Sequence, residues 1–91
     1  MHVYIQPIAK QFLQNAHAEN AAGAKAYMRN QFEYFGIKAA TRQSISNDYM
    51  KAELPAFTEL EIIVKELWQL PEREYQYFAI DLIAVMKKHW T

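Results

Sequence analysis

Apolar residues recur at three- and four-residue spacing along most of this 91-residue chain, and its two glycines and three prolines lie near the ends of these runs. Such spacing places apolar side chains on one face of an α-helix. The pattern predicts five helices and no strands. The expected helices cover about residues 6–15, 21–35, 40–52 and 72–89, with a fourth that starts at Thr58 and includes Trp68.

Residue types at the expected helix ends agree with these ranges. Pro71 suits a first helical turn, because the N–H groups there have no acceptor within the helix. Glu74 would place negative charge near the positive end of the last helix. Thr58 and Glu61 have the spacing of a capping box. Gly36 follows the second helix, where glycine is the common residue after a helix end.

The last helix differs from the others because it is apolar on two sides. One stripe consists of Tyr75, Ala79, Leu82 and Met86, and a second, partly separate stripe consists of Tyr77, Ile80, Ile83 and Ala84. A helix of this kind is expected to have neighbours on more than one side. The pattern favours antiparallel helix pairs of an α-α superhelix of the HEAT or ARM type, the opening of a longer solenoid, over a small closed bundle.

Composition and charge narrow the function only slightly. No apolar run reaches the length of a membrane span, and the N-terminus lacks the pattern of a signal peptide. The absence of cysteine fits a cytoplasmic protein. Net charge is zero, but residues 1–51 carry six basic and three acidic side chains and residues 52–91 carry four and seven. The basic excess allows nucleic-acid binding, and an ordinary solvated surface explains it equally well.

Two strings in the chain resemble a known family. AYMRNQFEYFGI occupies residues 26–37, and ELWQLPEREYQYFAIDL occupies residues 66–82. Their order and separation are similar to those of the DNA alkylation repair family, the AlkD-like DNA glycosylases built from HEAT-like repeats. The resemblance runs over essentially the whole chain but covers only the first part of that family's domain. It implies that residues 1–91 form a single unit, the N-terminal portion of a longer HEAT-like repeat domain.

The resemblance also suggests which residues contact DNA. Such glycosylases hydrolyse the N-glycosidic bond of cationic N3- or N7-alkylated purines in double-stranded DNA. An aromatic residue on their second helix helps line the cleft for the damaged nucleotide, and Tyr27 stands in that place. Arg29 has the chemistry for a phosphate or sugar contact. Lys38 and Arg42 follow the turn that approaches the duplex in the family. Spacing alone makes Tyr27 a core residue and Arg29 a solvated one.

The chain is not expected to contain a catalytic centre. The family's catalytic aspartate and tryptophans belong further along its domain, so neither Asp81 nor Trp90 matches them. Asp81 is expected to form a hydrogen bond or charge pair between helices, and Trp68 to be buried in the core. The three histidines have no metal-ligand spacing, and no metal or organic cofactor is implied.

These expectations leave the chain's own activity uncertain, and the 91 residues alone are predicted to be inactive. The alternative function is a non-catalytic helical-repeat module that binds DNA or protein, because a repeat fold does not fix a function. The second apolar stripe also predicts that the chain associates with itself through residues 72–89.

Overall fold

Helices make up most of the computed structural model, which describes residues 1–89. Its elements are α1 Ile5–Gln14, α2 Ala18–Tyr27, α3 Ala39–Ala52, the short 3-10 helix η1 Phe57–Glu59, α4 Leu60–Gln69 and α5 Arg73–His89. The described residues contain five α-helices and no strand, which confirms the predicted all-α fold. No helix among them is long and apolar enough to cross a membrane.

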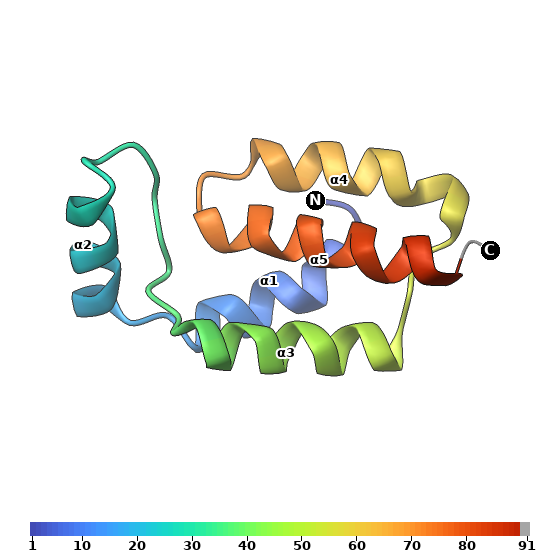
Figure 1. The fold of residues 1–91 in the computed structure, drawn as a ribbon, viewed down its shortest axis with the longest axis horizontal. Coiled ribbons are helices and arrows are strands. Elements are labelled where there is room, and N and C mark those ends of the chain that lie inside the picture. The colour runs from blue at the N-terminus through green and yellow to red at the C-terminus, as the bar shows by residue number, and fades with distance from the viewer. Residues whose placement is uncertain (90–91) are drawn as a thin grey trace.

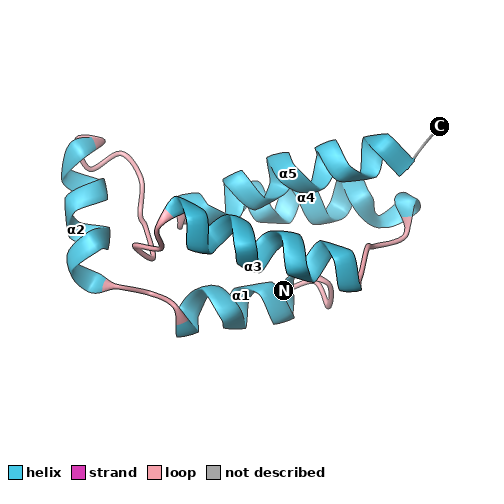
Figure 2. Ribbon diagram, turned by 60° about the horizontal axis from the view of Figure 1, so that its bottom comes forward, coloured by secondary structure: helices cyan, strands magenta, loops and turns pink. Residues whose placement is uncertain are grey.

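The helices form two antiparallel pairs, with one helix apart from both. Helix α4 runs antiparallel to α5, and α1 runs antiparallel to α3 (Figure 1). Helix α5 packs against both α4 and α3, so it joins the two pairs. Helix α2 lies at one end of the molecule, across the direction of the other helices (Figure 2). The two antiparallel pairs fit the helical repeats expected from the sequence, and α2 lies outside them (Figure 1).

The core is centred on Phe78 in the middle of α5. Its side chain is fully buried, and its ring centroid lies 6.4 Å from those of Tyr4 and Phe12 and 6.3 Å from that of Tyr49. These rings come from the start of the chain, α1 and α3, so one side chain links three segments to α5. The predicted stripe on this face is buried as expected: Tyr75, Ala79, Leu82 and Met86.

The second predicted stripe of α5 remains largely uncovered. Ile80 is 50% exposed and Ile83 is 41% exposed, and Ala84 is exposed as well. Tyr77 is half-buried because its ring faces Arg42 of α3. Helix α5 is therefore apolar on two sides, as predicted, and only one side is fully packed within the described chain.

The second helix ends earlier than its sequence pattern predicts. It stops at Tyr27 rather than Phe35, and Arg29 and Asn30 follow with positive φ angles of 56° and 61°. The Asn30 N–H donates to the carbonyl oxygen of Lys25 and so closes the helix end. The apolar residues beyond this point do not extend the helix, because their backbone is bonded to α5 instead.

Two predictions about the fourth helix are wrong. Helix α4 begins at Leu60, after the 3-10 helix η1, and no side chain caps it, so Thr58 and Glu61 do not form a capping box there. Trp68 is 48% exposed rather than buried. The neighbouring Leu67 occupies the buried face, which turns the Trp68 ring toward the surface.

Candidate functional site

The segment 28–38 connects α2 to α3 and passes beside the first turn of α5. Gly36 lies within this segment with a φ of +87°, a value that side-chain-bearing residues rarely adopt. A Cβ atom at this position would overlap the carbonyl oxygen of His17 and crowd the backbone of Ala21. Glycine therefore allows the segment to lie directly against the start of α2, where the His17 N–H donates to the carbonyl oxygen of Phe35.

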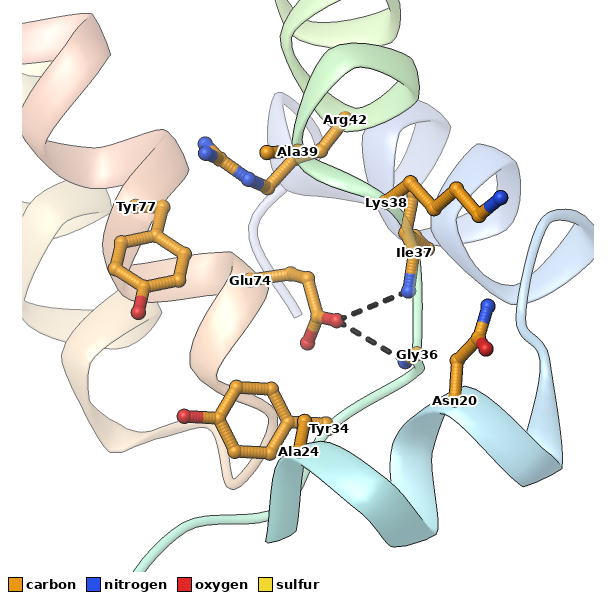
Figure 3. Close-up of a pocket in the computed structure, with 10 residues that line it drawn as sticks. All are labelled: Asn20, Ala24, Tyr34, Gly36, Ile37, Lys38, Ala39, Arg42, Glu74 and Tyr77. Carbon is orange, nitrogen blue, oxygen red and sulfur yellow. Dashed lines mark hydrogen bonds between the residues drawn. The ribbon is translucent and has the colours of Figure 1, made fainter. Parts of the chain in front are cut away.

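The carboxylate of Glu74 holds the same segment from the side of α5. Glu74 is 2% exposed, and its carboxylate accepts hydrogen bonds from the backbone N–H groups of Phe35, Gly36 and Ile37 at 3.0, 3.1 and 3.4 Å. Figure 3 shows the carboxylate facing this turn. A buried carboxylate is costly unless it is hydrogen-bonded, and bonds to a charged acceptor are stronger than neutral ones. Glu74 is thus a structural anchor for the turn.

Arg73, the preceding residue, contacts the segment through an aromatic ring. Its guanidinium carbon lies 4.5 Å from the ring centroid of Phe32, 5.3 Å from that of Tyr77 and 5.8 Å from that of Trp68. Cations are attracted to the negative faces of aromatic rings at such distances. The Arg73 backbone N–H also donates to the carbonyl oxygen of Glu33 at 2.8 Å. Trp68 therefore contacts Arg73 from its half-exposed position on α4.

Arg42 links α3 to α5 at the other end of this region. Its Nη1 lies 3.7 Å from Oδ2 of Asp81, and its guanidinium carbon lies 4.7 Å from the ring centroid of Tyr77. The side chain of Arg42 is only 14% exposed. The pair confirms the expectation that Asp81 forms a charge pair between helices.

These residues surround a cleft of about 340 Å³ between α2, α3 and α5. Its polar and aromatic lining includes Asn20, Tyr34, Lys38, Arg42, Glu74 and Tyr77. The Arg42 guanidinium points toward Tyr77, whereas Lys38 extends away from it (Figure 3). Burial, and secondarily the neighbouring Tyr77, raise the pKa of Tyr34. The described residues contain no group of three His, Cys, Asp or Glu that could hold a metal ion.

Comparison with known proteins decides the family. Residues 8–91 match the family model described as DNA alkylation repair enzyme. The chain belongs to the DNA alkylation repair enzyme family. No curated protein matches the chain significantly. The match confirms the family inferred from the two sequence strings, and it supports a role in DNA alkylation repair with DNA as the partner.

The four residues suggested by this family resemblance lie in two places. Lys38 and Arg42 both line the cleft. Tyr27 is the last residue of α2 and is 87% exposed, and Arg29 is exposed just beyond it. The core position that spacing alone predicts for Tyr27 is therefore wrong. Its position beside a damaged nucleotide, which the family resemblance implies, stays a prediction.

Several cleft residues escaped the sequence prediction, chiefly Tyr34, Glu74 and Tyr77. Glu74 has a signal that could have revealed it. It lies four residues before Phe78 and eight before Leu82, so helical spacing places its carboxylate on the buried face of α5. An acidic residue at such a position needs hydrogen-bond donors from another segment. The residues next to Glu74 in the sequence do not indicate which segment supplies these donors.

Proposed function

We propose that this chain serves in a DNA glycosylase for cationic N3- or N7-alkylated purines, where it binds the duplex beside the lesion. The observation that carries the proposal is the family match over residues 8–91. In this proposal the 91 residues contribute binding rather than hydrolysis. The reason is that the family resemblance matches none of them to the catalytic aspartate or tryptophans.

The exposed ring of Tyr27 supports this function. A purine alkylated at N3 or N7 carries a positive charge, and the electron-rich face of tyrosine attracts cations. The charge also makes the base a good leaving group, so such an enzyme mainly has to hold the lesion and stabilise positive charge on the sugar. Tyr27 is 87% exposed, so its ring is accessible to a displaced base.

Basic groups near the two ends of segment 28–38 supply plausible phosphate contacts. Arg29 and Lys38 are both exposed, and none of their side-chain atoms forms an ion pair within the described chain. Lys38 precedes the first turn of α3, whose N–H groups have no side-chain cap and favour an anion. Arg42 is the weaker candidate, because it would have to leave Asp81 to reach a phosphate.

Binding to duplex DNA should be weak, salt-dependent and tighter when the duplex contains one N7-methylguanine. Each phosphate contact contributes a slope of about −0.9 in log affinity against log salt. Tyr27→Ala should remove a preference of about two- to fivefold for the methylated duplex, the range expected of an exposed cation–π contact. Fluorescence anisotropy at several salt concentrations measures both quantities.

Ile62→Ala is the matched control for this experiment, because Ile62 is an exposed apolar residue of α4, at 57% exposure. This variant should retain the preference. Neither duplex should lose a base to the isolated chain. Equal loss of preference in both variants would contradict the proposed role of Tyr27. Release of methylated base by the chain itself would contradict the proposed division between binding and hydrolysis.

We also propose that the chain associates with a second copy of itself through residues 72–89. The exposed side chains of Ile80 and Ile83 lie on this helix, and Ile83 borders a hollow that Leu60 and Val64 of α4 also line. Contiguous apolar surface of this kind favours association in water.

Sedimentation velocity across a concentration series should show an oligomer that Ile83→Glu converts to a monomer, because a charge in the contact would lose its hydration. Leu13→Glu is the control, since Leu13 is 67% exposed on α1, away from the proposed contact. A monomer at every concentration, or the same behaviour of both variants, would argue against this interface.

A further inference from the structure

Three successive backbone N–H groups in segment 28–38 converge on the carboxylate of Glu74. They belong to Phe35, Gly36 and Ile37, and their distances to the carboxylate oxygens are 3.0–3.4 Å. Consecutive N–H groups of this kind form concave sites that ordinarily bind anions. Here a carboxylate of the chain itself occupies the site, so these three groups are not available to a DNA phosphate.

The bonds to Glu74 have a consequence for the next residue, Lys38. It follows Ile37 directly, is the residue before α3, and has an extended backbone with φ −62° and ψ 145°. Its side chain is exposed and extends away from Glu74 and Tyr77 (Figure 3). An anchor on the Ile37 N–H therefore constrains where the Lys38 side chain and the first turn of α3 can lie.

We propose that Glu74 is a positioning residue for DNA binding, which fixes the turn 35–37 so that Lys38 and the start of α3 face a phosphate. The inference rests on the proposed function, because it concerns how the same surface meets the duplex. Arg73 supports the arrangement from the same helical turn: its N–H bonds Glu33 and its guanidinium covers Phe32. Two adjacent residues of α5 thus hold segment 28–38 at two successive places, residues 32–33 and residues 35–37.

The direction in which one substitution changes the DNA affinity distinguishes this positioning role from a simple effect of charge. Glu74→Gln removes a negative charge, which by itself should strengthen binding to DNA. It also replaces one carboxylate oxygen with an NH₂ group, which opposes the backbone N–H groups of the turn. If Glu74 positions Lys38, the variant should bind about three- to tenfold more weakly at low salt, with a salt slope reduced by about 0.9.

Glu72→Gln is the matched control, because it makes the same change of charge two residues away. The Glu72 side chain forms no hydrogen bond or ion pair with the described residues. This variant should bind DNA as tightly as the parent chain, or slightly more tightly. Lys38→Ala should weaken binding in the parent chain but add little in Glu74→Gln. Lys10, an exposed lysine of α1 outside segment 28–38, is the control, and Lys10→Ala should have the same effect in both backgrounds.

Amide hydrogen exchange shows whether each variant is still folded. In Glu74→Gln the amides of residues 35–37 should lose protection, while those in the buried centre of α5 keep it. Glu74→Asp retains the carboxylate on a shorter side chain and should restore part of both the protection and the DNA affinity. These readouts keep the test informative even where overall stability falls.

Weaker binding by Glu74→Gln, together with loss of protection at residues 35–37 and recovery in Glu74→Asp, would support the proposal. Unchanged or tighter binding by Glu74→Gln, as in Glu72→Gln, would overturn it and leave the proposed DNA binding intact. Additive effects of Glu74→Gln and Lys38→Ala would also overturn it. If the parent chain does not bind duplex DNA, the proposed function itself fails.

Discussion

Replacing Phe78 with alanine should destabilise the chain by about 3–5 kcal/mol. The Phe78 side chain is fully buried and lies among rings from three other segments: those of Tyr4, Phe12 and Tyr49. The substitution removes these contacts and leaves a cavity that helices on both sides cannot close. A domain of this size is stabilised by roughly 5–14 kcal/mol, so a large part of its stability would be lost.

Urea unfolding followed by circular dichroism measures this effect as a shift of the midpoint at constant slope. Ile80→Ala is a suitable comparison, because Ile80 lies two residues further along α5 and is 50% exposed. Its truncation should cost less than about 1 kcal/mol in the monomer, since little buried contact is lost. Similar losses in the two variants would mean that the packed face of α5 has been assigned incorrectly.

The sequence predicted those parts of the fold that depend on local periodicity. The number and order of the helices follow from apolar spacing, apart from the bounds of α2. The division of α5 into a packed stripe and an open one follows from it as well. A charge pair or hydrogen bond of Asp81 between helices was also expected, but its partner Arg42 was not. The helices and the two stripes of α5 depend on residues only a few positions apart.

The features that the sequence did not predict depend on contacts between distant segments. Helix α2 ends at Tyr27 because the backbone from Glu33 to Ile37 bonds to Arg73 and Glu74, nearly forty residues away. Apolar spacing continues through Phe35 and does not indicate that this backbone bonds to α5 rather than within a helix. Trp68 was misplaced for a related reason, since the cation beside its ring comes from the following helix.

The candidate site was only partly predictable for the same reason. Lys38 and Arg42 were identified by the family resemblance and do line the cleft, but Tyr34, Glu74 and Tyr77 meet them only in the folded chain. Tyr27 and Arg29 are at the other end of segment 28–38, at the exposed end of α2. The route of this segment therefore decides whether the two groups of residues can act on one duplex.

Gly36→Ala should disrupt that route more than any change of charge nearby. A side chain at a φ of +87° costs about 1–3 kcal/mol through backbone strain. The added Cβ would in addition overlap the carbonyl oxygen of His17, a backbone atom that can move only if the start of α2 moves with it. We therefore expect α2 to separate from segment 28–38, with loss of the hydrogen bond between the His17 N–H and the Phe35 oxygen.

The second glycine of the chain supplies the opposite expectation. Gly23 lies within α2, and a Cβ there would meet no atom within 4 Å. Gly23→Ala should stabilise this helix by about 0.5–1 kcal/mol, because alanine loses less backbone entropy on folding. Amide protection across α2 and the denaturant midpoint should therefore rise in Gly23→Ala and fall in Gly36→Ala. Protection of α2 in Gly36→Ala equal to that in the parent chain would show that the helix is not held by this contact.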